Sequence, residues 1–202
     1  MDGDQSHLGA MKVKPLAGTE VFHRQGVALE HNVADFWRWA YSNLAANNLR
    51  GHLAEFLVGS DLGVTDRPRV EWADHDLRTK SGFKVEVKSA AYLQTWKQSR
   101  CSTISFGVAP TKSFNDTTGK REQKSERGAD VYVFCLLAHK DKSTLDPLNM
   151  DQWQFFVLAT RRMDAALGAQ ESLSLSRLMK LGPIQCTYGG ISRAIDKAMD
   201  TV

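Results

Sequence analysis

The spacing of apolar residues predicts two consecutive helices in the first third of the chain. The first is expected from Val33 onward, where six apolar residues recur at helical spacing: Val33, Phe36, Trp37, Ala40, Tyr41 and Leu44. The second is expected from about Asn47 to Gly59, with Leu49, Leu53, Phe56 and Leu57 on one side and Gly51, Glu55 and Val58 on the other. A helix that is apolar on both sides is usually buried between layers. Glu55 is therefore an acid at a position that disfavours acids.

Alternating residues predict a β-hairpin after these helices. Strand patterns cover residues 69–77 (RVEWADHDL) and the segment from Phe83 (FKVEVKSAA), and the RTKSG between them suits a tight turn. With the turn centred near Lys80 and Ser81, Glu86 lies opposite Asp74 or Asp76, and opposed residues share a face. One face is therefore expected to carry Asp74, Asp76, Glu86 and Lys88, and the other face Phe83, Val85 and Val87. Lys84, nearer the turn, is expected to be an exposed charge.

The rest of the chain predicts an α/β or α+β fold. A further strand is expected within residues 101–109, followed by a long polar loop at residues 110–128. Near-continuous apolar runs at residues 129–138 and 153–160 are typical of central strands, and short helices are expected at residues 174–181 and 191–199. Residues 1–30 are interpreted as a loosely held N-terminal arm. Residues 31–202 are interpreted as one domain, a central mixed β-sheet flanked by helices.

The composition is that of a globular protein. Of the 202 residues, 42% are hydrophobic and 24% are charged, and the net charge of +3 permits nucleic acid as a partner without requiring it. The cysteines, Cys101, Cys135 and Cys186, have no zinc-binding spacing, which favours reduced thiols. The N-terminus lacks the apolar region of a secretory signal, and no apolar run approaches about 20 residues. We therefore expect a cytoplasmic protein without a membrane span.

The acids of the predicted hairpin suggest a metal site. Carboxylates that face each other across a hairpin, joined by a third from a buried helix, can bind Mg²⁺, which prefers oxygen ligands. Lys88 shares the face of Glu86 and could position or deprotonate a metal-bound water for attack on a phosphodiester. The alternative is a solvated strand face with cross-paired charges, which is common. The small residues after Lys88 (Ser89, Ala90 and Ala91) favour the metal site, since solvated strands seldom continue into such a segment.

Four segments, GHLAEFLVG, ADHDL, VEVKSA and RGADVYVFCLL, resemble the PD-(D/E)xK nuclease superfamily over about residues 47–160. The resemblance implies the restriction-endonuclease-like fold, a three-layer sandwich, and a Mg²⁺-dependent nuclease in which Mn²⁺ can replace Mg²⁺. It also implies metal ligands at Glu55, Asp76, Glu86 and the backbone carbonyl of Val87, a catalytic Lys88, and Gln94 near the site. The proline of the motif is absent, which leaves open whether Asp74 or Asp76 is the ligand. We favour Asp76, which is nearer the turn.

The expected substrate is DNA, preferably double-stranded, with RNA left open. Candidate phosphate contacts are Lys97 and Arg100, on a helix expected to leave the active strand, and four residues of the polar loop: Lys112, Lys120, Arg121 and Lys124. An ordinary solvated loop is the alternative. A homodimer would let two sites cut both strands, and restriction, repair and mobile-element roles all remain open. The second hypothesis is a catalytically inactive nucleic-acid-binding or assembly module that retains the fold.

Overall fold

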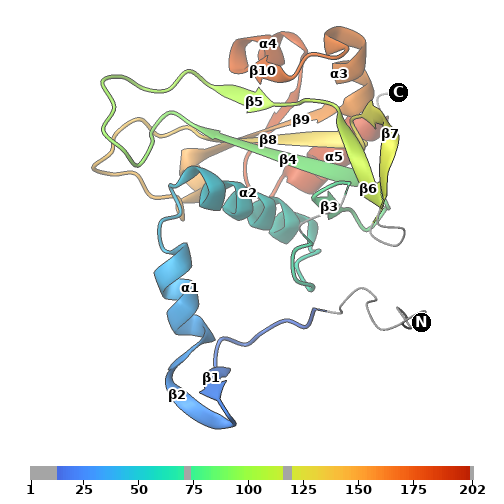
Figure 1. Ribbon diagram of the computed structural model, residues 1–202. Helices are drawn as coiled ribbons and strands as arrows, with labels where there is room; N and C mark the ends of the chain where they lie inside the picture. Colours follow the sequence, from blue (N-terminus) through green and yellow to red (C-terminus); the bar gives the residue numbers. More distant parts are fainter. Residues whose placement is uncertain (1–12, 71–73, 116–119, 201–202) are drawn as a thin grey trace, which may run out of the picture.

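The computed structural model describes residues 13–70, 74–115 and 120–200, and these form a central five-stranded sheet with helices on both faces (Figure 1). The strand order is β11 (Ile184–Cys186), β9 (Trp153–Ala159), β8 (Val131–Leu137), β4 (Lys84–Ala91) and β3 (Leu77–Arg78). Strands β4 and β8 run parallel, whereas the other neighbours are antiparallel. The predicted mixed sheet is confirmed. Among the described helices, none combines the length and apolar character needed to cross a membrane.

Layers cover both faces of the sheet. Strand β8 is buried along its whole length, Cys135 included, and the short helical turn Met150–Gln152 leads into the equally apolar β9. Helices α2 (Asn47–Leu62) and α5 (Ile191–Asp200) pack on one face. Helices α3 (Thr160–Leu167) and α4 (Leu175–Lys180) cover the other, together with the strand pair β5 (Ser105–Gly107) and β10 (Ser172–Ser174). The predicted three-layer α+β sandwich is confirmed, and the three cysteines are free thiols.

One buried arginine joins the start of β8 to the segment after α3. The Nε of Arg127 donates to the carbonyl of Val108 at 2.8 Å, and its Nη1 donates to Asp164 Oδ1 at 2.6 Å and to the carbonyl of Gly168 at 2.8 Å. Its Nη2 donates to the carbonyl of Gln170 at 2.8 Å. Because these partners satisfy a guanidinium that is almost wholly buried, Arg127 stabilises the packing of two loops.

The predicted hairpin exists, but its first strand is short. Strand β3 covers Leu77–Arg78 rather than residues 69–77, of which residues 71–73 lie outside the described part of the chain. Leu77 pairs with Val85, and the amide of Gly82 donates to the carbonyl of Thr79 at 3.0 Å, which puts the turn at Lys80 and Ser81 as predicted. Before Leu77, the carboxylate of Asp76 accepts the amide of Val87, which a backbone carbonyl would accept in a regular ladder. This side-chain bond explains why β3 begins only at Leu77.

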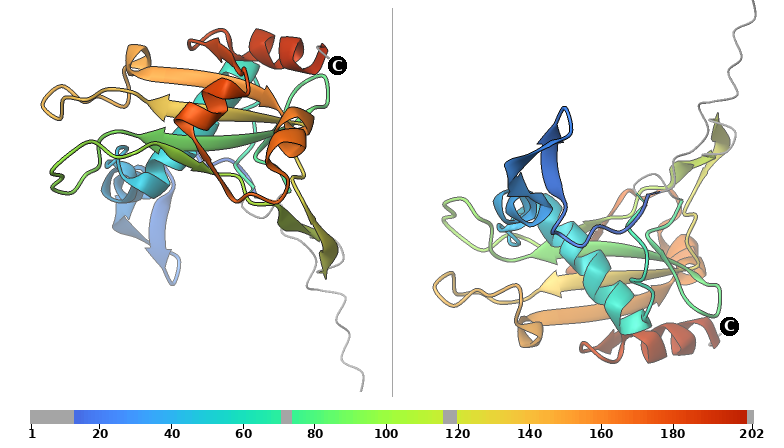
Figure 2. Two further views of the ribbon diagram at one scale, coloured as in Figure 1. Left: turned by 90° about the horizontal axis from the view of Figure 1, so that it is seen from above. Right: turned by 90° about the horizontal axis from the view of Figure 1, so that it is seen from below.

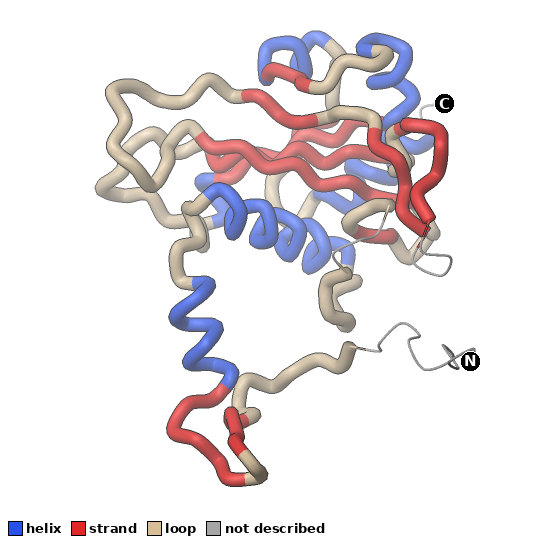
Figure 3. Tube along the Cα trace, viewed as in Figure 1, coloured by secondary structure: helices blue, strands red, loops and turns tan. Residues whose placement is uncertain are grey.

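The N-terminal part projects from the sandwich. Strands β1 (Val21–Arg24) and β2 (Val27–Asn32) form a hairpin, and α1 (Val33–Tyr41) follows it (Figures 1 and 3). The predicted helix is confirmed, but its apolar stripe is not buried: no residue of α1 is buried, and Phe36, Trp37 and Tyr41 are 42%, 39% and 44% exposed. The predicted boundary at residue 30, between an N-terminal arm and the domain, stays a prediction. The part that projects from the sandwich continues past this residue through α1.

Two polar segments differ from the prediction. Residues 110–128, expected as a loop, contain a hairpin of β6 (Thr111–Asn115) and β7 (Lys120–Glu126) that extends beyond the sheet (Figure 2). The segment after β4, expected to begin a helix, is a loop. In this loop the amide of Gln94 donates to Gln98 Oε1 at 2.6 Å, and Gln98 Nε2 donates to the carbonyl of Tyr92 at 3.3 Å. Side chains therefore satisfy backbone groups that a helix would otherwise pair.

Candidate active site

The candidate site begins with two carboxylates at the edge of the sheet. Leu77 pairs with Val85, and this register continued by one residue puts Asp76, one of the two acids that the sequence left open, opposite Glu86. The amide of Asp76 donates to the carbonyl of Val85 at 3.1 Å, and the amide of Val87 donates to Asp76 Oδ2 at 2.7 Å. These two bonds fix the Asp76 carboxylate against β4.

The second part of the site is a lysine on the same face as Glu86. Val85 and Val87 pack into the core beneath α2, so the alternating Glu86 and Lys88 point to the other face of β4. The Nζ of Lys88 donates to Glu86 Oε1 at 2.5 Å, and both side chains are partly exposed. The predicted sharing of a face by Glu86 and Lys88 is confirmed.

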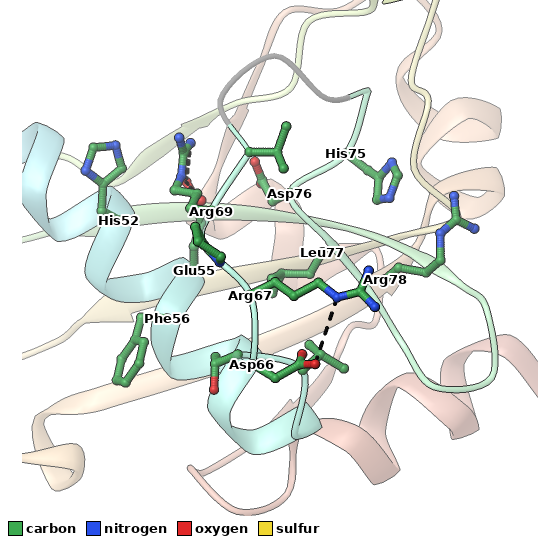
Figure 4. A pocket seen from close by; sticks show the side chains of 14 residues that line it. His52, Glu55, Phe56, Asp66, Arg67, Arg69, His75, Asp76, Leu77 and Arg78 are labelled. Atoms are coloured by element: carbon green, nitrogen blue, oxygen red, sulfur yellow. Dashed lines mark hydrogen bonds and ion pairs between the residues drawn. The ribbon is translucent and has the colours of Figure 1, made fainter. Parts of the chain in front are cut away.

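A third carboxylate comes from α2. The side chain of Glu55 is only 13% exposed, as expected for an acid on a helix between layers. Arg69 holds it through two hydrogen bonds: its Nε donates to Glu55 Oε2, and its Nη2 donates to Glu55 Oε1 at 3.0 Å. This ion pair compensates the burial of the acid. Figure 4 shows Arg69 against Glu55, with Asp76 beside them.

Asp76 carries the clearest electrostatic signature of the site. Burial, together with the charges of Glu86 and Glu55, raises the pKa of Asp76 to about 7, against the opposing effects of the Val87 amide and the charge of Lys88. Glu55 and Glu86 therefore both act on Asp76, one from α2 and one from β4. The raised pKa therefore reflects the burial of this carboxylate first and the charge of the neighbouring acids second.

Asp74, the alternative ligand, is in a different environment. Lys84 Nζ donates to Asp74 Oδ2 at 2.6 Å, and the other Asp74 oxygen contacts His75 Nδ1. Burial alone would raise the pKa of Asp74, but the bonds from Lys84 and His75 outweigh it and the pKa is lowered. Lys84 is thus an ion-pair partner rather than the expected exposed charge. The register puts Asp76, not Asp74, opposite Glu86.

The donor set fits a divalent cation in its chemistry. Within residues 13–70, 74–115 and 120–200, no group of three or more His, Cys, Asp or Glu side chains is arranged to hold a metal. Glu55 is held by Arg69 and Glu86 by Lys88. The oxygens are nevertheless of the kind that Mg²⁺ prefers, and the raised pKa of Asp76 reflects charge that a cation would offset. A cation at Asp76 and Glu86 would therefore compete with Lys88 for the Glu86 carboxylate.

The remaining predicted residues lie apart from the acids. Gln94 is in the loop after β4, where its Nε2 donates to the carbonyl of Ala91 at 3.1 Å. A strand rises about 3.3 Å per residue, so the end of β4 at Ala91 is about 16 Å from Glu86. Lys97 and Arg100 are exposed in the same loop. The structure therefore does not bring Gln94 to the acids, and its predicted catalytic role has no support in its position.

Four predicted phosphate contacts fall in the β6–β7 hairpin, namely Lys112, Lys120, Arg121 and Lys124. Only their backbone positions belong to the described structure, and their side chains lie outside it. Their role in nucleic-acid binding stays a prediction.

Beside the acids lies a cavity of about 620 Å³ that the sequence did not reveal. It is bounded by α2, by the segment of residues 64–70 and by the start of β3, and its lining includes His52, Glu55, Phe56, Arg67, Arg69 and Asp76 (Figure 4). Arg69 is 14 residues from Glu55 in the chain and follows no motif.

The fold and the site define an α/β protein with an acidic group and a lysine at one edge of a mixed central sheet. Residues 30–176, which include Glu55, Asp76, Glu86 and Lys88, match the family described as bacteriophage T4 endonuclease IV. The match covers well over half of the chain, so the protein belongs to this endonuclease family. The expected nuclease class is confirmed at this level. Comparisons with curated proteins and with solved structures give no match.

Proposed function

We propose that the protein is a Mg²⁺-dependent endonuclease that hydrolyses phosphodiester bonds of DNA. The observation that carries this proposal is the attachment of Asp76 to the backbone of Val85 and Val87, on either side of Glu86, with Lys88 on the same strand and face as Glu86. Membership of an endonuclease family supports it independently.

In this proposal Asp76 and Glu86 bind the cation, with the carbonyl of Val87 and the Glu55 carboxylate as further oxygen donors. A bound divalent cation would stabilise negative charge on the phosphate and lower the pKa of the attacking water. The Nζ of Lys88, once released from Glu86, would orient that water or accept its proton. The amide of Val87 keeps Asp76 in place against β4.

We further propose that this group is the PD-(D/E)xK type of site, with Asp76, Glu86 and Lys88 as its signature. The three-layer sandwich and the parallel pairing of β4 with β8 are compatible with this assignment. Double-stranded DNA as the substrate and a homodimer that cuts both strands remain predictions, as does the choice among restriction, repair and mobile-element roles.

A plasmid cleavage assay tests the proposed function. Supercoiled DNA is incubated with the parent protein in Mg²⁺, in Mn²⁺ and in excess chelator, beside the Glu86→Ala variant. We expect nicking by the parent with either metal and none with chelator or with Glu86→Ala. Equal cleavage by parent and variant would refute the assignment of Glu86. A parent that cleaves neither plasmid nor single-stranded DNA would instead support the inactive binding module.

A further inference from the structure

The cavity beside the acids has features that the proposed chemistry does not use. Phe56 lines it and is 58% exposed, although its neighbours in α2, Leu57 and Val58, are buried in the core. An aromatic ring kept in contact with solvent at the wall of a cavity contributes little to folding. Such a ring is suited to stacking on a planar ligand.

The cavity also carries guanidinium groups close to the acids. Arg67 is 88% exposed, and the ionic contact it makes within the described residues is a long one of 3.9 Å with the similarly exposed Asp66, a pair that contributes little to stability. Arg69 lies on Glu55, which in turn acts on Asp76. Guanidinium groups match phosphate oxygens in geometry and charge. An anion bound here would therefore lie next to the proposed cleavage site.

The size of the cavity fits a ligand larger than an ion. At about 620 Å³ it is in the range of sites that enclose small organic molecules. Its lining offers the ring of Phe56, the guanidinium groups of Arg67 and Arg69, and the carboxylates of Glu55 and Asp76. These features match a nucleotide, which combines a planar base with an anionic phosphate.

We propose that this cavity binds one nucleotide of the substrate strand, with the base against Phe56 and the phosphate beside Arg67 and Arg69. The inference rests on the proposed function for the identity of the strand. When the phosphate binds, Arg69 exchanges the Glu55 carboxylate for phosphate oxygens. Glu55 is then released toward Asp76, so substrate binding and completion of the acidic site occur together. The pairing of Glu55 with Arg69 is the state without substrate.

The test measures binding separately from cleavage. A fluorescently labelled single-stranded oligonucleotide is titrated with protein in excess chelator, where no metal-dependent cleavage occurs, and anisotropy gives the Kd. We expect Phe56→Ala to weaken binding about tenfold, since base–aromatic stacking is worth about 1–3 kcal/mol. Phe56→Tyr, which keeps the ring, should bind like the parent, and Arg67→Gln should weaken binding and reduce its salt dependence.

Two controls fix the interpretation. Trp39→Ala removes an exposed aromatic ring of the projecting helix α1, and Arg193→Gln removes an exposed arginine of α5, and neither residue lines the cavity. Circular dichroism confirms that each variant is folded. The proposal is overturned if Phe56→Ala and Arg67→Gln bind no more weakly than these controls, or if the parent does not bind the oligonucleotide.

Failure of this proposal and failure of the proposed function are distinguishable. If the parent cleaves plasmid but the cavity variants bind and cleave as the controls do, the nucleotide site is wrong and the nuclease assignment stands. If the parent cleaves nothing but Phe56→Ala still weakens binding about tenfold, the nucleotide site stands without the nuclease assignment.

Discussion

The burial of Asp76 among other acids predicts that replacing it stabilises the metal-free protein at alkaline pH. The pKa of Asp76 is raised from its usual value of 3.8 to about 7. The folded protein therefore binds this proton more tightly than the unfolded chain does. The stabilisation of the folded state by protonated Asp76 is complete below pH 4 and is lost as the pH rises through about 7. Each unit between the two pKa values of 3.8 and about 7 corresponds to about 1.4 kcal/mol. The lost free energy of unfolding therefore reaches about 4 kcal/mol at pH 8.

Asp76→Asn removes this dependence, because the amide oxygen can still accept the hydrogen bond from Val87 but carries no charge. Urea unfolding in excess chelator, at several pH values between 4 and 8, measures the free energy of unfolding of parent and variant. We expect the variant to gain on the parent steadily across this range, by up to about 4 kcal/mol.

Asp74→Asn is the matched control, because its neighbours lower the pKa of Asp74 and the sign reverses. This variant should be less stable than the parent at pH 8. A difference between parent and Asp76→Asn that does not change with pH would refute the electrostatic account of the site.

Three further variants test other parts of the structure. Lys88→Gln should lower the cleavage rate at least about 100-fold, yet change the free energy of unfolding by less than about 1 kcal/mol, because the pair of Lys88 with Glu86 is partly exposed. A cleavage rate within about threefold of the parent would contradict the role of Lys88. Arg69→Gln should destabilise the protein by about 1–3 kcal/mol by leaving Glu55 without its partner. A double-mutant cycle with Glu55→Gln should give a coupling free energy above about 1 kcal/mol, and additive effects would argue against this pair. Arg127→Ala should cost about 3 kcal/mol or more in urea unfolding, because four acceptors lose a buried donor; a cost under about 1 kcal/mol would show that the loops pack without it.

The acid pair could be predicted because a hairpin has few degrees of freedom. Side chains alternate with a period of two, and the turn at Lys80 and Ser81 sets which residues oppose each other, so local sequence narrows the residue opposite Glu86 to Asp74 or Asp76. Glu55 could be predicted as a buried acid from the apolar residues around it. Its partner Arg69 could not, because the contact spans a segment without periodicity.

Other features depend on what covers an element, which periodicity does not encode. The apolar stripe of α1 predicts a helix correctly, yet Phe36, Trp37 and Tyr41 of that stripe remain exposed because α1 projects from the sandwich. Phe56 was expected on a buried side of α2 and instead lines the cavity. The β6–β7 hairpin has few apolar residues to mark its faces, so its strands resemble a loop in sequence.

The most direct test of the central claim is the titration of Mn²⁺ or Mg²⁺ into the protein by isothermal calorimetry. Parent, Asp76→Asn, Glu86→Gln and Asp74→Asn are compared under one set of conditions. The account predicts that the parent binds the cation, that Asp76→Asn and Glu86→Gln each bind at least about tenfold more weakly, and that Asp74→Asn binds like the parent. Cation binding that survives both Asp76→Asn and Glu86→Gln, or that is lost only in Asp74→Asn, would contradict it.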